Sequence, residues 1–253
     1  MSRSASSPPR DPVQKMSNMY RWTRHVYDAT RRYYLLGRDP MLNDIAEQPA
    51  GSVLEIGCGT ARNLRLLDQR APQHTLYGLD ASLSMLATAR AKLDRTGCTE
   101  RITLGHGVAQ HLSPSEQLRT DGPFDLIFFS YVLSMIPDWP VALRAALRHL
   151  APDGRLYIVD FWDQAALPDW LAGGLQRWLA LFDVYPRPGL VAALRALDDC
   201  DHLSSTVTPV ARRYAYRATL HRSGPLPSAA LDPLDAAAPP ESKRFDRSDF
   251  IPA

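Results

Sequence analysis

Short apolar runs and longer amphipathic stretches alternate regularly between residues 52 and 161. The apolar runs predict strands at 52–57, 74–79, 101–106, 124–131 and 154–161, and the amphipathic stretches predict helices at 60–70, 82–96 and 138–151, with a weak helical segment at 113–120. The run at 124–129 is apolar on both strand faces, which is typical of a central strand. This alternation predicts a parallel sheet with helices on both faces.

The segments outside this alternation have other patterns. Residues 17–37 have helical character, 167–181 and 188–198 predict two further helices, and 203–221 predicts a late hairpin. Residues 1–16 and 223–253 are expected to be disordered, the second because it is rich in proline, alanine, serine and charge. The predicted domain therefore covers residues 17–222.

The stretch Val53–Leu64 places an apolar strand, a glycine-rich turn and a helix-forming segment one after another. Gly57 and Gly59 permit positive φ angles and let a ligand approach the backbone where a Cβ atom would collide. The N–H groups at the start of the following helix offer donors and a partial positive charge. The turn predicts a ligand site, although a structural turn without a ligand has the same order of elements.

Two ligand classes use such a turn, and the spacing of its small residues separates them. The dinucleotide fingerprint G-x-G-x-x-G needs a third glycine where this chain has Arg62, which argues against a nicotinamide oxidoreductase. The pattern E-x-G-x-G-x-G fits at Glu55, Gly57 and Gly59 and departs at Ala61. The chain thus resembles the class I S-adenosylmethionine-dependent methyltransferases. The resemblance implies an α/β fold, a doubly wound Rossmann-like sheet of seven strands with an antiparallel last strand.

Asp80 ends the next apolar run, 21 residues after Gly59. A carboxylate at about this distance from a glycine turn is well placed to accept hydrogen bonds from a ribose diol. Asp80 is also a candidate N-cap for the helix that begins near Ser82, and the two roles are compatible.

The resemblance implies further cofactor contacts near the ends of the strands. The family often has Gly-Asp-Ala after the third strand, whereas this chain has Val108 in place of the acid, so the adenine contact falls to the backbone or to Gln110. The complete predicted cofactor set is Glu55, Gly57, Gly59, Thr60, Asn63, Asp80, Ala81, Ser82, Met85, Ala109, Gln110 and Ser130.

Composition narrows the function classes. The net charge of +2 over 253 residues is too balanced to argue for nucleic acid. The three cysteines are scattered, so neither a disulfide framework nor a zinc site is expected, no metal is assigned, and a reducing cytoplasm fits. No apolar run is long enough to predict a transmembrane helix.

The segment before the first predicted strand carries an unusual helix face. Tyr20, Thr23, Tyr27, Thr30 and Tyr34 share that face, which Arg24 and Arg31 border. Tyrosine has an apolar body with a polar tip, so such a face can cover a cofactor, hold an anionic group or lie at a membrane interface. An ordinary packing helix is the alternative.

The stretch Tyr20–Asp39 resembles the betaine-lipid N-methyltransferases, which convert diacylglyceryl-homoserine into diacylglyceryl-trimethylhomoserine. The similarity continues through residues 55–64, 85–90, 167–170 and 178–187. It implies S-adenosylmethionine as cofactor, a lipid headgroup at a membrane surface as partner, and a cytoplasmic enzyme that contacts the inner membrane face.

The same resemblance suggests roles for the acceptor residues. Tyr27 and Tyr131 are the catalytic candidates, because either could orient the nitrogen lone pair. The predicted substrate residues are Tyr20, Arg24, Arg31, Tyr34 and Trp162, of which the arginines would hold the acceptor carboxylate and the aromatic rings a quaternary ammonium. A phosphatidylethanolamine or small-molecule methyltransferase and a non-catalytic cofactor-binding protein are the alternatives.

Overall fold

The structure is a computed structural model that describes residues 35–98, 100–180, 184 and 186–237. Contacts between Cα atoms divide the chain into two units, Met1–Leu36 and Gly37–Ala253, and every helix and strand named below belongs to the second. The helix predicted at 17–37 lies outside the described residues except for its last three positions. Those three positions are not helical.

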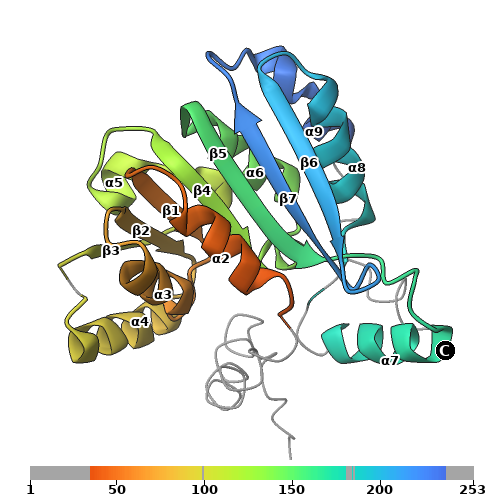
Figure 1. The fold of residues 1–253 in the computed structure, drawn as a ribbon, viewed down its shortest axis with the longest axis horizontal. Helices are drawn as coiled ribbons and strands as arrows, with labels where there is room; N and C mark the ends of the chain where they lie inside the picture. The colour runs from red at the N-terminus through yellow and green to blue at the C-terminus, as the bar shows by residue number, and fades with distance from the viewer. Residues whose placement is uncertain (1–34, 99, 181–183, 185, 238–253) are drawn as a thin grey trace, which may run out of the picture. The chain divides into compact units, whose positions relative to one another are not determined.

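Within the described residues, seven strands form one sheet in the order β3-β2-β1-β4-β5-β7-β6 (Figure 1). The β1–β5 strands are parallel, and β7 runs antiparallel to both β5 and β6. The bounds are β1 Ser52–Ile56, β2 Thr75–Asp80, β3 Ile102–His106, β4 Phe124–Ser130, β5 Leu150–Phe161, β6 Leu203–Val210 and β7 Ala215–Arg222. The predicted seven-stranded sheet with an antiparallel last strand is confirmed.

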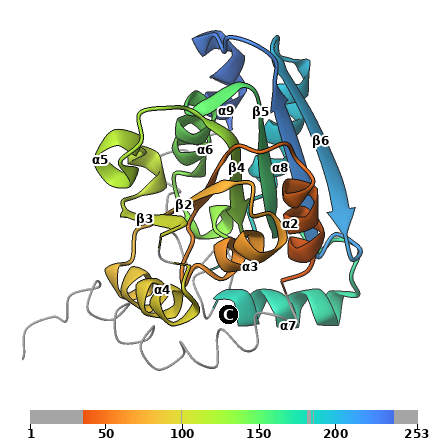
Figure 2. The ribbon, with the colours of Figure 1, turned by 60° about the vertical axis from the view of Figure 1, so that its left-hand side comes forward.

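Helices cover both faces of this sheet, so the central strands are apolar on both sides. The helices α2 and α3 lie on one face and α6, α8 and α9 on the other (Figures 1 and 2). The bounds are α2 Arg38–Ala46, α3 Arg62–Arg70, α4 Leu83–Thr96, α5 Pro114–Leu118, α6 Trp139–Arg148, α7 Asp169–Ala180, α8 Pro188–Ala196 and α9 Asp232–Ala236, with 3₁₀ turns at Ala109–His111, Leu133–Met135, Leu197–Asp199 and Ser228–Leu231.

The helix α2 was not predicted. Gly37, at φ 81°, precedes it, and its buried side chains include Met41, Leu42 and Ile45. Arg217 of β7 forms an ion pair with Asp44, which ties this helix to the sheet. The tertiary contacts therefore stabilise a helix whose own sequence pattern is weak.

The chain continues to pack beyond Arg222, so the expectation of disorder from residue 223 is wrong for residues 223–237. Ala230, Leu231 and Leu234 are buried, and the Arg144 guanidinium of α6 donates to the Leu231 carbonyl over 3.0 Å. The composition argument failed because a few apolar residues among prolines and alanines are enough to cover α6. The rest of the predicted tail, 238–253, lies outside the described residues.

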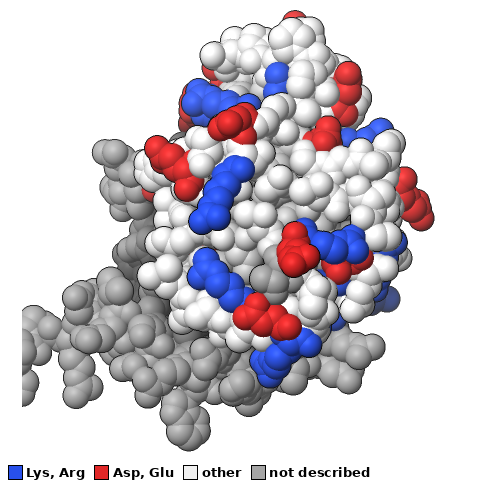
Figure 3. Space-filling view, turned by 90° about the vertical axis from the view of Figure 1, so that its left-hand side faces the viewer, with Lys and Arg blue, Asp and Glu red and all other residues white. Residues whose placement is uncertain are grey.

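The surface charges in Figure 3 are interspersed. On the face shown there, acidic and basic side chains lie next to one another in the described part of the chain, in keeping with the small net charge. No helix within the described ranges is both long enough and apolar enough to cross a membrane.

Removing the Leu234 side chain is expected to destabilise the fold. Leu234 is fully buried, so Leu234→Ala should lower the free energy of unfolding by about 2–4 kcal/mol in urea denaturation. Leu226→Ala is the matched control, since Leu226 is only partly buried and should cost less. Equal, negligible effects of the two substitutions would contradict the packing of α9.

Candidate cofactor and acceptor site

The glycine turn after β1 is held against the end of β2 by the backbone. The N–H groups of Gly57 and Cys58 both donate to the Leu79 carbonyl, over 2.8 and 3.0 Å. Gly57 and Gly59 have φ angles of 77° and 54°, as the sequence predicted. The turn therefore depends on pairing between β1 and β2, not only on its own residues.

The two glycines are required for different reasons. A Cβ atom on Gly57 would lie 2.4 Å from Cγ2 of Val132, whereas a Cβ atom on Gly59 would meet no protein atom within 4 Å. Gly57 is thus a packing requirement, and the expectation that a ligand approaches its backbone is not supported. Gly59 leaves the open space that a bound cofactor would use.

Ala61 occupies the last glycine position of the motif and adopts the left-handed conformation, with φ 57° and ψ 30°. This conformation costs an L-residue about 1 kcal/mol or more. The Ala61 methyl group is completely buried, and burial of one methyl group returns about 0.8 kcal/mol. Alanine is therefore tolerated where the family pattern has glycine.

Asp80 joins three elements at the carboxyl end of β2. Its Oδ2 accepts a hydrogen bond from the Gly59 N–H over 2.7 Å, and its Oδ1 accepts one from the Ser82 N–H over 2.8 Å. Ser82, rather than Asp80, is the N-cap of α4, since its hydroxyl accepts from the Met85 N–H. A carboxylate offers about four lone-pair sites, so a group of this kind suits the ribose diol predicted for Asp80.

Glu55 and Asn63 are buried, and their side chains are hydrogen-bonded to each other. Asn63 Nδ2 donates to Glu55 Oε1 over 2.7 Å, which ties the start of α3 to β1. Thr60 is also buried. These three residues shape the turn, and their direct contact with a cofactor stays a prediction.

Cys58 lies inside the turn but does not fit the role of a nucleophile. Burial raises the pKa of its thiol well above the usual value, and the Glu55 and Asp80 carboxylates raise it further. The neutral thiol fills space beneath the turn, since a Cβ atom on Gly78 would lie 2.9 Å from its sulfur.

Two apolar side chains are exposed at the neighbouring strand ends. Leu83, in the first turn of α4, is 62% exposed and Val108, after β3, is 42% exposed. The carboxyl ends of β2 and β3 are tied together, because the Gly107 N–H donates to the Asp80 carbonyl over 3.1 Å. Such a pair beside Asp80 fits a flat apolar ring such as adenine. Val108 thus offers apolar surface that an acid at its position would not offer, and sequence reasoning missed Leu83.

Other predicted cofactor residues surround this pair. Ala81 is exposed, Met85 and Ala109 are buried, and Gln110 and Ser130 are half-buried. A ring nitrogen of His106 lies 3.2 Å from the Ala81 carbonyl and links β3 to the turn after β2. The residues present therefore fit an adenosine group held between Gly59, Asp80 and Val108.

Tyr131 follows β4 and faces the interior. Its φ angle is 56°, its N–H donates to the Val159 carbonyl over 2.8 Å, and its ring packs edge-on against Phe161. Burial raises the pKa of the phenol well above its usual value, Tyr214 and Asp160 raise it further, and the charge of Arg38 opposes them. Tyr131 is thus a neutral phenol that can orient a group but cannot act as a phenolate base.

Asp160, the penultimate residue of β5, holds the loop that follows β4. Its carboxylate is 1% exposed and accepts from the N–H groups of Ser134, over 3.0 Å, and Phe161, over 2.8 Å. Burial raises the pKa of this carboxyl to about 6, against the opposing hydrogen bonds. Val132 of the same loop packs on Gly57, so Asp160 supports the glycine turn from the opposite side.

The surroundings of Trp162 do not match its predicted contact with a quaternary ammonium group. Its ring is buried in the main core cluster, beneath the guanidinium groups of Arg213 at 4.6 Å and Arg195 at 5.7 Å from the ring centre. Side chains of the protein already cover the face that was expected to meet a quaternary ammonium. The sequence placed Trp162 after a strand end but did not show which way the ring turns.

The remaining acceptor predictions lie outside the described residues. These residues are Tyr20, Arg24, Tyr27, Arg31 and Tyr34. Within the described ranges, no group of three or more His, Cys, Asp or Glu side chains is arranged to hold a metal ion.

Comparison with known proteins agrees with this geometry. Residues 27–197 match the family described as "Methyltransferase domain". A trans-aconitate 2-methyltransferase of Deinococcus radiodurans is 36% identical over 45% of this chain and 39% of its own length. A demethylmenaquinone methyltransferase of Lactobacillus johnsonii is 27% identical over 77% of this chain and 78% of its own. This chain therefore spans about two fifths of the first relative.

Solved structures show the same fold at low sequence identity. A putative S-adenosylmethionine-dependent methyltransferase of Methanococcus maripaludis has a TM-score of 0.60 at 16% identity, covering 88% of this chain and 99% of its own. Because the family match covers more than half of the residues, the chain belongs to the methyltransferase domain family. The predicted class and its cofactor, S-adenosylmethionine, are confirmed at the level of the family.

The two glycines of the turn should respond differently to alanine. Gly57→Ala adds a Cβ clash to an unfavourable φ angle and should cost about 3 kcal/mol of unfolding free energy. Gly59→Ala should cost only about 1 kcal/mol but weaken S-adenosylmethionine binding at least tenfold, measured by isothermal titration calorimetry. Unchanged cofactor affinity in Gly59→Ala would show that the open space at Gly59 is not the cofactor site.

Asp160 should make stability depend on pH. Because its pKa rises from 3.8 unfolded to about 6 folded, the stability it contributes is present at low pH and is lost as pH rises through 6. The difference in unfolding free energy between the native protein and Asp160→Asn should fall by about 1 kcal/mol from about pH 5 to about pH 7. A difference that stays constant or rises would contradict the raised pKa.

Proposed function

We propose that this protein is an S-adenosylmethionine-dependent N-methyltransferase that methylates the amine of an amino-acid lipid headgroup, converting diacylglyceryl-homoserine into diacylglyceryl-trimethylhomoserine. The family match and the glycine turn with Asp80 support the methyl donor. The acceptor rests on the resemblance of several residue blocks to betaine-lipid methyltransferases and on a buried cation near Tyr131.

When bound, S-adenosylmethionine supplies a sulfonium methyl group; its transfer forms a C–N bond, breaks the C–S bond to leave S-adenosylhomocysteine, and releases a proton from nitrogen. The chain's own residues provide positioning. Asp80 would hold the ribose hydroxyls, and Gly59 would let the cofactor approach the backbone. Tyr131, as a neutral phenol, would orient the amine lone pair.

The observation that carries the acceptor proposal is the position of Arg38. This first residue of α2 is only 4% exposed, and its positive charge lowers the pKa of Tyr131 against the larger effects of burial, Tyr214 and Asp160. Gly37, just before it, packs against Val159 of β5. A buried cation at the carboxyl ends of β4 and β5 is suited to a carboxylate beside the reacting amine.

A soluble carboxylate is the second candidate acceptor. Several relatives are named trans-aconitate 2-methyltransferases, and trans-aconitate carries carboxylates that Arg38 could equally attract. The same site chemistry would then serve O-methylation. Phosphatidylethanolamine, which has an amine beside a phosphate, is a third.

The purified protein with S-adenosylmethionine should separate these acceptors. Incubation with diacylglyceryl-homoserine micelles, phosphatidylethanolamine micelles or trans-aconitate, followed by mass analysis, is expected to show stepwise methylation of the homoserine lipid only. Methylation of trans-aconitate alone would replace the lipid proposal by the soluble one.

Arg38 variants test the carboxylate contact in the same assay. Arg38→Ala should raise the KM for the lipid about tenfold or more, the loss expected for a charged hydrogen bond, while Arg38→Lys should recover part of it. Arg101→Ala is the control, because Arg101 pairs with Asp68 at a site remote from the carboxyl ends of the strands.

A further inference from the structure

A buried glutamine whose side chain has no hydrogen-bond partner among the described residues lies just after β5. Gln164 is 1% exposed, and neither its Nε2 nor its Oε1 forms a hydrogen bond with any described residue. A buried polar group left unsatisfied costs about 1–3 kcal/mol. Since native proteins satisfy nearly all such groups, this amide indicates a partner beyond the described residues.

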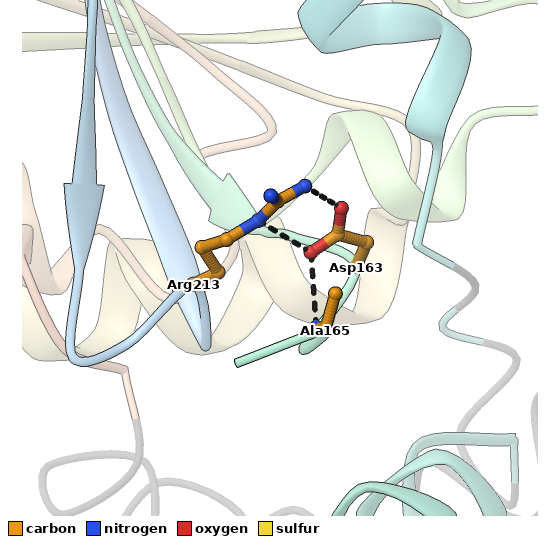
Figure 4. A network of polar contacts seen from close by, with 3 residues as sticks. All are labelled: Asp163, Ala165 and Arg213. Atoms are coloured by element: carbon orange, nitrogen blue, oxygen red, sulfur yellow. Dashed lines mark hydrogen bonds and ion pairs between the residues drawn. The ribbon is translucent and has the colours of Figure 1, made fainter. Parts of the chain in front are cut away.

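The backbone around Gln164 is held in place on both sides. Its φ angle is 58°, its N–H donates to the Arg213 carbonyl over 3.0 Å, and its carbonyl accepts from the Leu167 N–H over 2.9 Å. Asp163 forms an ion pair with Arg213 and also accepts from the Ala165 N–H over 3.1 Å (Figure 4). An unfavourable backbone conformation persists where surrounding contacts over-determine it, as they do here.

The segment Asp163–Ala165 lies at the carboxyl end of β5, beside Tyr131. Phe161, the last residue of β5, packs its ring between those of Tyr131 at 4.7 Å and Tyr214 at 5.7 Å. Trp162 N–H then donates to the Tyr214 carbonyl, so the chain runs from the ring beside Tyr131 directly to Gln164. In open α/β sheets, ligands bind outside these carboxyl ends.

We propose that the Gln164 side chain binds the amino-acid group of the acceptor. The Nε2 amide would donate to the acceptor carboxylate, and the Oε1 carbonyl would accept from an amine N–H. A carboxamide suits this ligand class because it offers a donor and an acceptor on one short side chain. The inference rests on the proposed function and adds a residue to its acceptor site.

This arrangement also distinguishes acceptor from product. Each methylation replaces one N–H of the amine by a methyl group and releases a proton. The dimethylated amine has an N–H only while it is protonated and the trimethylated nitrogen has none, so the product loses a contact that the unmethylated and monomethylated acceptors make. Gln164 would therefore favour binding of the incompletely methylated lipids over the final one.

Gln164→Met tests the proposal, since methionine has a similar length and makes no strong hydrogen bonds. The KM for diacylglyceryl-homoserine micelles should rise about tenfold or more, with unchanged S-adenosylmethionine affinity and an unchanged or higher melting temperature. Gln73→Met is the matched control, because Gln73 is exposed, lies at the amino end of β2 and already bonds to the Ala46 carbonyl. It should leave the KM unchanged.

A second variant keeps the test independent of folding in the first. Gln164→Glu retains an acceptor oxygen but loses the donor, so it should weaken binding of the homoserine lipid and recover it with the carboxamide analogue of the headgroup. Wild-type KM in both Gln164 variants would overturn the inference and leave the amide bonded to a buried water only. A native protein that binds S-adenosylmethionine but does not methylate the lipid would overturn the proposed function as well.

Discussion

The hydrogen bonds of the Asp80 carboxylate organise the cofactor half of the site. One oxygen holds the glycine turn after β1 and the other holds the entry to α4. Both bonds join a carboxylate to backbone N–H groups, and such charge-assisted hydrogen bonds are stronger than neutral ones. Because a single side chain spans three elements, the glycine turn, the end of β2 and the start of α4 keep one relative geometry.

Asp160 likewise holds two parts of the structure together, at the carboxyl end of β5, but its burial as an ion lowers the stability of the fold. Its carboxylate is buried and its pKa is raised, so the fold spends stability at neutral pH to keep it ionised. In return, it holds the loop whose Val132 packs on Gly57 of the glycine turn. The two halves of the site are thus coupled through packing rather than through a shared charge.

Sequence reasoning succeeded where the signal was local. The strands, most of the helices and the Asp80 turn follow from apolar periodicity and from glycine spacing. It failed for α2, which the contacts to β7 stabilise, and for residues 223–237, whose few apolar side chains find α6. It also misjudged the direction of the Trp162 ring and did not indicate that Arg38, Asp160 and Gln164 are buried, because burial and side-chain direction depend on residues far away in the chain.

The sequence by itself determined the sheet, its glycine turn and the carboxylate that follows it, because these depend on short-range patterns and on the conformations that glycine permits. Only the tertiary structure decided that Gly57 packs against Val132 while Gly59 borders open space, since that distinction depends on a residue far away in the chain. It likewise decided that the buried Gln164 side chain has no hydrogen-bond partner among the described residues, while the buried Trp162 ring has two arginine partners. Desolvation and hydrogen bonding act on neighbours in space, which the order of residues does not specify.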